Sequence, residues 1–384
     1  MLLGELIGPL KKLPENVIEA KEISDILKRG SDWQDQRMIV KVYDYSEFKE
    51  DVTNWFKYIA LSDLTLYNVI DEILSSEKLA PFKSVAEAKF PPKLQHLRFK
   101  KFHGFILRER TRALKEDDVW VFDKISTKEL VAKHRDLNTT VRIPLNAVGR
   151  GLRRISYVNS MDVSDTSDYF IIDWFNGIRD MARLLLDHKD LRNFTSHVVE
   201  QWKNKYDSFK TYILLAQRFD MSAIGTSLVS FYSDEPIIGT NQFWCIMGPR
   251  DNYAKILTLW MNSTINLIQM LMIRRETRGA WLQIDEYALK NALMPDPNKL
   301  STHEEKELLT LFKKVGKEKM PSILEQLKEK HPTRKLIDET WLRILGYKGN
   351  IDSLLDRLYS SIANEIELLK KMMAEGIIEE EEDV

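Results

Sequence analysis

The run from Ile256 to Ile273 carries no charged residue over 18 consecutive positions, although 30 % of the whole chain is charged. An apolar stretch of this length reaches the lower limit for a membrane span. Several of its positions are polar, and each would be costly in lipid, among them Asn262, Ser263, Thr264, Asn266 and Gln269. We therefore expect a helix buried inside a globular domain, without membrane association.

Composition agrees with a globular protein of the reducing cytoplasm. The chain has 384 residues, of which 43 % are hydrophobic, and at about 150 residues per domain we expect two or three domains. Its single cysteine, Cys245, excludes an intramolecular disulfide framework and a cysteine zinc cluster. The amino terminus, Met1–Glu5, lacks the basic region and long apolar run of a secretory signal.

Local patterns predict strands and helices along the first 300 residues. Three- and four-residue spacing of apolar side chains predicts helices within 47–73 and 177–210. The sequence around Gly149–Gly151 predicts a turn. Short apolar or β-branched runs predict strands at Met38–Val42, Val119–Phe122, Thr139–Ile143, Tyr169–Ile172, Tyr212–Leu215 and Ser227–Tyr232.

Helix signals dominate after residue 300. Ser301 and Glu304 form a capping-box pattern, and Gly316 and Gly346 are suited to ending helices. An apolar stripe from Leu355 to Met373 predicts a long final helix, and we expect a solvated, disordered tail after it. The predicted fold class is α+β, a mixed α/β body with a carboxy-terminal helical domain. The expected units are a mainly helical region 1–88, an α/β domain 89–300, a helical domain 301–378 and an acidic tail 379–384.

Positive charge is concentrated in one segment. Residues 89–154 carry a net charge of +10, whereas the whole chain carries −1. A local surplus of this kind is typical of a surface that meets a polyanion, and the alternative is a charged face that meets only solvent. The candidate DNA-contacting side chains in it are Lys100, Lys101, Arg108, Arg110, Arg112, Arg150, Arg153 and Arg154.

Lysine and arginine neutralise phosphates, and arginine also reads guanine edges. The phenylalanines interleaved with these cations, such as Phe99 and Phe105, are more typical of the buried side of an element than of base stacking. Glycine would let the backbone at Gly149–Gly151 approach a phosphate or base closely. An exposed turn with solvated arginines explains the same residues equally well.

Known catalytic motifs are absent from the sequence. There is no phosphate-binding loop, dinucleotide fingerprint, Gly-x-Ser-x-Gly elbow or zinc-binding histidine pair. The Asn/Asp-Pro-Pro-aromatic tetrapeptide needed for adenine methylation is also missing, so we assign no catalytic residue and no metal ligand. A metal-dependent nuclease site at Asp71, Glu87 and Lys89 remains as an alternative, because paired carboxylates hold divalent ions.

Several strings resemble the carboxy-terminal target-recognition region of adenine-N6 DNA methyltransferases from restriction–modification systems. The resemblance covers residues 95–375 and implies sequence-specific DNA recognition, whereas the methylating half of the family is missing. It also implies that S-adenosylmethionine binds to a catalytic partner and not to this chain. The strings are Asp168–Ile172, Ser230–Pro236, Lys255–Thr264, Arg274–Trp281 and Trp341–Gly346.

On this resemblance, Arg274, Arg275 and Arg278 are further candidates for contact with DNA or with the methylating partner. The alternative for the first two is that their charges complement the dipole at a helix carboxy terminus. The function expected from the sequence is a recognition module for double-stranded DNA, non-catalytic by itself, that works with a methyltransferase domain or subunit. A nuclease, or an adaptor whose final helix packs on another subunit, are the alternatives.

Overall fold

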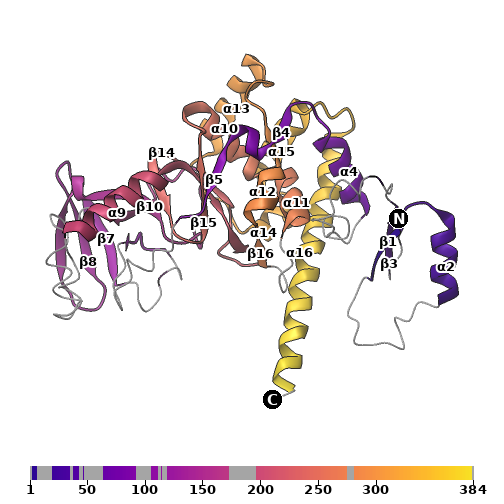
Figure 1. Ribbon diagram of the computed structural model, residues 1–384, viewed down its shortest axis with the longest axis horizontal. Coiled ribbons are helices and arrows are strands. Elements are labelled where there is room, and N and C mark those ends of the chain that lie inside the picture. Colours follow the sequence, from indigo (N-terminus) through magenta and orange to yellow (C-terminus); the bar gives the residue numbers. More distant parts are fainter. Residues whose placement is uncertain are drawn as a thin grey trace.

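In a computed structural model, the chain is described for residues 2–6, 20–34, 38–42, 46, 64–91, 105–110, 114, 119–172, 196–274 and 281–382. Helices and a mixed set of sheets make up the structure (Figure 1), which confirms the α+β fold class with a helical carboxy-terminal region. The predicted division of the chain at residues 88 and 300 stays a prediction.

A seven-stranded sheet forms the centre of the protein, in the order β5-β15-β12-β14-β10-β11-β6. Neighbouring strands are antiparallel except for β10 and β14, which run parallel. Its strands are β5 (Glu87–Lys89), β6 (Phe105–Ile106), β10 (Val148–Leu152), β11 (Asp168–Ile171), β12 (Thr211–Ala216), β14 (Ser230–Gly239) and β15 (Phe243–Met247). The predicted strands at 169–172, 212–215 and 227–232 therefore exist, with shifted ends.

Four smaller sheets complete the strand inventory of the described residues. Three strands, β7 (Trp120–Ile125), β8 (Glu129–His134) and β9 (Thr140–Pro144), form one meander. The others are β1 (Leu2–Leu6), β3 (Met38–Val42) and β2 (Trp33–Gln34) in one sheet, β13 (Arg218–Asp220) with β16 (Trp281–Gln283), and β4 (Leu79–Pro81) with β17 (Leu293–Pro295).

The predicted turn at Gly149–Gly151 is wrong, because these residues lie in the middle of β10. Both glycines are needed for close packing within the protein. A Cβ atom on Gly149 would clash with the Tyr206 hydroxyl group, and one on Gly151 would lie 2.9 Å from the Ile238 carbonyl oxygen. The close approach expected for a ligand is therefore made by the chain's own residues.

Helices cover the sheet and form the carboxy-terminal region. The helix predicted within 47–73 is present from Leu64 onward, and that within 177–210 from Ser196 onward. The described helices are α2 (Ala20–Arg29), α4 (Leu64–Leu74), α5 (Phe82–Val85), α9 (Ser196–Phe209), α10 (Asp251–Met261), α11 (Thr264–Ile273), α12 (Glu286–Asn291), α13 (Thr302–Val315), α14 (Ile323–Lys328), α15 (Pro332–Ile344) and α16 (Ile351–Glu382), with a short 3₁₀ turn at Leu145–Ala147.

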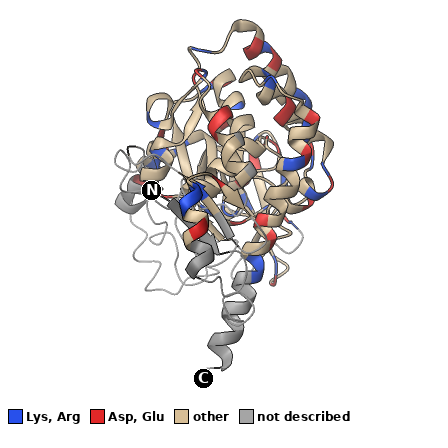
Figure 2. Ribbon diagram, turned by 90° about the vertical axis from the view of Figure 1, so that its right-hand side faces the viewer, with Lys and Arg blue, Asp and Glu red and all other residues tan. Residues whose placement is uncertain are grey.

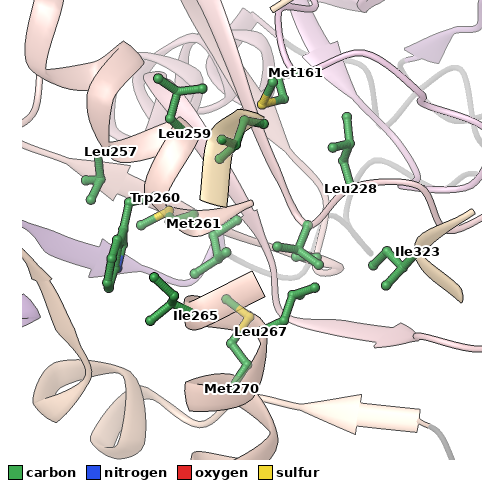
Figure 3. Packing of buried hydrophobic residues seen from close by; sticks show 14 of the residues in the cluster. Met161, Leu228, Leu257, Leu259, Trp260, Met261, Ile265, Leu267, Met270 and Ile323 are labelled. Atoms are coloured by element: carbon green, nitrogen blue, oxygen red, sulfur yellow. The ribbon is translucent and has the colours of Figure 1, made fainter. Parts of the chain in front are cut away.

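The uncharged run forms the centre of the main core, as expected, but as two helices. α10 and α11 meet at a 70° bend, and Ser263 caps α11 by accepting a hydrogen bond from the Asn266 amide. Their apolar side chains pack with those of the sheet and of α14 (Figure 3), and Trp260 and Leu267 are at most 1 % exposed. Among the described residues, no single helix has the length and apolar character of a membrane span, although this bent pair passes that test together.

Buried polar groups hold the α10–α11 bend against the helical region. The Asp338 carboxylate accepts hydrogen bonds from the Thr264 amide at 2.7 Å and the Tyr359 hydroxyl at 2.8 Å. The Arg334 guanidinium donates to the Asn262 carbonyl oxygen at 3.2 Å. Since Arg334 and Asp338 are at most 2 % exposed, the polar positions that interrupt the apolar run serve to join α11 to α15 and α16.

A second, smaller core lies between the β7–β9 meander, the β6–β11–β10 side of the large sheet and α9. Phe105, Trp120 and Phe170 are at most 3 % exposed there. The buried position of Phe105 confirms that this phenylalanine packs inside, whereas Phe99 lies outside the described residues. The meander and α9 form one end of the molecule, opposite the amino-terminal strands β1 and β3 (Figure 1).

The predicted capping box and helix ends after residue 300 are confirmed. Ser301 and Glu304 cap α13, which ends at Gly316, and Gly346 follows α15 with φ of +87°. The final helix α16 is longer than expected, because its backbone stays helical to Glu382, through most of the tail predicted to be disordered.

The apolar stripe of α16 packs on the chain itself. Leu355, Leu358, Ile362 and Ile366 are at most 1 % exposed and belong to the main core. These side chains are therefore not available for another subunit, and the adaptor alternative is wrong for this part of the stripe. Met373 lies beyond the residues whose side chains are described.

Candidate nucleic-acid interface

A short loop before β11, residues 164–168, brings several of the predicted arginines together. The loop is fixed by its own hydrogen bonds. The Asp162 carboxylate accepts from the Ser164 amide at 3.0 Å, and the Val163 carbonyl oxygen accepts from the Ser167 amide at 2.8 Å. Its backbone carbonyls then receive arginine side chains from β10 and from the segment after β6.

Asp168 is the centre of this arrangement. Its carboxylate, which is fully buried, accepts hydrogen bonds from the backbone amides of Arg108 at 2.9 Å and Arg153 at 3.1 Å. The Arg110 guanidinium lies 3.0 Å from the same carboxylate, with its side chain 12 % exposed. One acidic side chain thus joins the ends of β6 and β10 to the start of β11.

The Arg108 side chain lies flat on an aromatic surface. Its guanidinium carbon is 3.7 Å from the centre of the Phe122 ring and 5.3 Å from that of Tyr169. The two rings stack on each other with centres 5.5 Å apart, and the Arg108 Nε donates to the Ser167 carbonyl oxygen at 3.2 Å. Cation–π contact and hydrogen bonding together fix this cation at the junction between the large sheet and β7.

Arg150 joins β10 to one of the strings that carry the family resemblance, Ser230–Pro236. From β10, its guanidinium donates to the Ser164 carbonyl oxygen at 2.6 Å and to the Asp234 carboxylate at 2.7 Å, and it lies 3.2 Å from the Glu235 carboxylate. The side chain is 23 % exposed, whereas those of Asp234 and Glu235 are more than 60 % exposed. Arg150 is therefore held chiefly by acidic groups of the chain itself.

Two of the remaining candidates that the structure describes are largely buried. Arg154 and Arg274 are 9 % and 8 % exposed. Arg274 donates to the Leu271 carbonyl oxygen at 2.9 Å, which is the helix-end role given above as its alternative. Contact of Arg108, Arg110, Arg150 and Arg153 with DNA stays a prediction. Lys100, Lys101, Arg112, Arg275 and Arg278 lie outside the described residues.

Sequence reasoning missed a cationic face on the β7–β9 meander. The strand register places Lys124 and Arg142 opposite Val131, and Lys133 two residues further along the same face of β8. The Arg142 side chain is 70 % exposed and paired with Glu129, and that of Lys133 is 59 % exposed and paired with Asp123. Alternation of apolar and polar residues could not have signalled this face, because Trp120–Phe122 and Leu130–Ala132 are continuous apolar runs; the shared face follows from the strand register.

The helices on the opposite side of the molecule show no comparable grouping. Figure 2 shows basic and acidic residues interleaved along them, as in the ion pairs Lys328–Glu367 and Lys335–Asp352. Exposed pairs of this kind leave little net field. Lys133 and Arg142 of the meander are paired in the same way, but Lys124 and Lys128 beside them are exposed and form no ion pair within the described residues. These two lysines make the meander a candidate for an interface with nucleic acid.

The nuclease alternative finds little support in the geometry. Glu87 and Lys89 lie on the edge strand β5 with their side chains 3.8 Å apart, and Asp71 lies on helix α4. Across the described ranges, no group of three or more His, Cys, Asp or Glu side chains is arranged to hold a metal ion.

Comparison with known proteins shows a likeness of fold alone. The chain matches no protein-family model and no curated protein. Among solved structures it is similar to the type IIG restriction endonuclease BpuSI, with a TM-score of 0.53 and 11 % sequence identity. The likeness covers 98 % of this chain and 40 % of that protein, so the chain spans less than half the length of the endonuclease it resembles. At this identity the likeness is one of fold.

Proposed function

We propose that the chain is a DNA-recognition module of a restriction–modification system, with no catalytic activity of its own. The observation that carries this proposal is the likeness of nearly the whole chain to part of a type IIG restriction endonuclease. The strings that resemble target-recognition regions of adenine-N6 DNA methyltransferases support the same conclusion independently. One of these strings, Ser230–Pro236, contacts the basic segment 89–154 through the pair Arg150 and Asp234.

The geometry assigns different roles to the cations. Arg110 and Arg150 hold the 164–168 loop through internal carboxylates, so in this proposal they shape the interface. The exposed Lys124, Lys133 and Arg142 of the meander supply phosphate contacts, because an exposed cation releases condensed counterions from DNA when it binds. Residues beside this face would then contact the bases, because phosphate contacts carry no sequence information directly.

A methylating partner completes the proposal. The larger part of the endonuclease has no counterpart in this chain. Adenine methylation requires S-adenosylmethionine and a base extruded from the duplex, and we assign both tasks to a separate methyltransferase domain or subunit. In this arrangement the chain fixes the position of the complex on double-stranded DNA.

Salt-dependent binding tests the proposal. The affinity of the full chain for a dye-labelled, mixed-sequence duplex is measured by fluorescence anisotropy over a series of salt concentrations. We expect log affinity to fall linearly with log salt, with a slope of about −0.9 per neutralised phosphate. The double variant K133Q/R142Q should reduce the magnitude of this slope by up to about 1.8.

The matched control is K370Q/K371Q, which removes two exposed cations from α16 and should leave the slope unchanged. Equal losses for both double variants would assign binding to overall charge and contradict an interface on the meander. Duplex affinity that barely changes with salt would overturn the proposed function itself.

A further inference from the structure

The tip of the β7–β8 hairpin combines an exposed apolar side chain with two cations. Ile125 is 47 % exposed, and Lys124 and Lys128 on either side of it are also exposed. Within the described residues these two lysines form no ion pair, whereas Glu129, the nearest acidic residue of β8, pairs with Arg142. The tip is therefore apolar at its centre and positive at both edges.

The backbone of the tip is held firmly. Ser126 donates its amide to the Glu129 carbonyl oxygen at 2.8 Å, and its hydroxyl oxygen accepts from the Glu129 amide at 3.1 Å. The Leu145 amide donates to the Lys128 carbonyl oxygen at 3.1 Å, which ties the tip to the segment before β10. A side chain carried on such a turn loses little conformational freedom when it binds.

Ile125 points to the buried side of the hairpin but lies beyond the core. It pairs with Leu130, which is fully buried in the second core. A register shift between Phe122 and Lys124 marks a bulge in β7 just before the tip, and bulges turn the end of a strand to aim its side chains. Ile125 lies about 10 Å along the strand from Phe122, whose ring contacts the Arg108 guanidinium.

We propose that this tip is a DNA wedge, in which Ile125 enters between adjacent base pairs and Lys124 and Lys128 contact the phosphates on either side. Apolar side chains that enter the minor groove unstack a base step and kink the duplex, with flanking cations on the backbone. The inference rests on the proposed function and adds to it a way of deforming the duplex. Unstacking a step beside the target lowers the cost of base extrusion by the partner.

The test compares two hairpin ends of the same meander. Leu137, in the β8–β9 turn, is 52 % exposed and serves as the matched control for Ile125. Kinking is measured by energy transfer between dyes at the two ends of a mixed-sequence duplex. Affinity is measured for this duplex and for a copy with one central mismatch, whose weakened stacking makes it easier to kink.

We expect the wild-type chain to raise energy transfer and to bind the mismatched duplex more tightly. I125A should lose the rise in energy transfer and bind both duplexes equally, because it no longer unstacks the step that the mismatch weakens. It should bind the matched duplex about tenfold more weakly, because the contacts that the bend allows are lost. L137A should behave as wild type. K124Q/K128Q should reduce the magnitude of the slope of log affinity against log salt by up to about 1.8. I125T keeps the β-branched shape and serves as a second replacement if I125A folds poorly.

Each result has a distinct meaning. If I125A and I125T retain the kink and the preference for the mismatch, or if L137A loses them equally, the wedge is wrong while duplex recognition stands. A wild-type chain that binds duplex with a steep salt slope but leaves it straight also overturns only the wedge. If the wild-type chain shows no salt-dependent duplex binding, both the wedge and the proposed function are overturned.

Discussion

Asp168 is the single side chain on which most of the arginine geometry depends. Its buried carboxylate receives two backbone amides and the Arg110 guanidinium. Replacing it with asparagine keeps the size but removes the charge, and leaves a poorly exposed guanidinium without its counter-ion. We expect D168N to lower the free energy of unfolding by about 3 kcal/mol, measured by urea denaturation.

The control for this change is D165N. Asp165 pairs with Lys317, but both side chains are more than 60 % exposed, and an exposed pair contributes little to stability. D165N should therefore leave the urea midpoint unchanged. If D168N were as stable as D165N, Asp168 would not hold the loop as we describe.

His134 makes the second core sensitive to pH. Its Nδ1 atom accepts hydrogen bonds from the Asp136 and Leu137 amides, each at 3.1 Å, and its ring lies against that of Trp120 with centres 5.0 Å apart. Burial lowers the pKa of His134 below its usual 6.5, and the nearby Asp136 opposes this shift. The neutral ring is therefore the form that fits the β8–β9 turn.

The sign of the pH effect follows from this lowered pKa. The unfolded chain binds a proton at His134 more readily than the folded chain, so the stabilising contribution is present above pH 6.5 and is lost as the pH falls below it. H134N keeps an acceptor for the two amides but cannot titrate. We expect it to flatten this part of the stability profile, measured by urea denaturation across the pH range, whereas H303N, at an exposed position of α13, should keep the wild-type profile.

At the residue scale, the sequence identified the cationic side chains but not the acidic groups that they contact. The segment that supplies Arg108, Arg110 and Arg150 was identified from its charge alone. Their acceptors were not, because Asp168 lies 58 residues from Arg110 and Asp234 lies 84 residues from Arg150. Local spacing carries no information on contacts at such separations, and these contacts decide which cations stay exposed.

Among the elements, the α10–α11 bend has the clearest energetic basis. D338A would leave the Thr264 amide, the Tyr359 hydroxyl and the Arg334 charge uncompensated in a buried site. We expect a loss of about 4 kcal/mol in the free energy of unfolding, since an unpaired buried charge is costly. T310A, at an exposed α13 position, is the control and should change it by less than about 0.5 kcal/mol.

A much smaller loss in D338A would mean that water or neighbouring groups replace the carboxylate. The comparison with Y359F separates these effects, because that change removes one hydrogen bond without exposing a charge and should cost about 1 kcal/mol.

Helix ends were predictable and the bend was not. The capping residues Ser301 and Glu304 act within one turn, so their pattern is local. Ser263 is also a local cap, yet the uncharged run from Ile256 to Ile273 predicts one helix, because its apolar residues continue on both sides of Ser263. Glycine is suited both to turns and to strands that pack closely, so Gly149 and Gly151 alone do not distinguish a turn from β10. The Tyr206 ring against Gly149 shows the close packing, and its position could not be predicted from local sequence.

At the scale of the whole molecule, shortening α16 tests which part of this helix the fold requires. Its described core residues reach Ile366, with Leu369 packed at the edge. Removing residues 372–384 should therefore change the midpoint of thermal unfolding by only a few degrees. Removing 351–384 takes away seven buried hydrophobic side chains, from Leu354 to Ile366, and should abolish cooperative unfolding, measured by circular dichroism.

Equal stability of the two truncated chains would contradict the packing of α16 described above. The α+β class and the helical carboxy-terminal region were predictable at this scale because they depend on periodicity. The order of strands was not, since pairing across the sheet joins residues far apart in the chain.

The parallel pair β10–β14 has a consequence for how the protein unfolds locally. In the described sheet it is the one pairing between strands of the β6–β11–β10 side and those of the β14–β12–β15–β5 side, and it involves three residue pairs, from Arg150–Ile237 to Leu152–Gly239. Most buried residues of each side belong to a different apolar core, although Ile238 of β14 packs in the smaller core and Leu152 of β10 in the larger. Proteins built in this way lose structure in separate cooperative units. Amide protons of β11 and β8 should therefore exchange with solvent in one kinetic group, and those of β12 and α10 in a slower one.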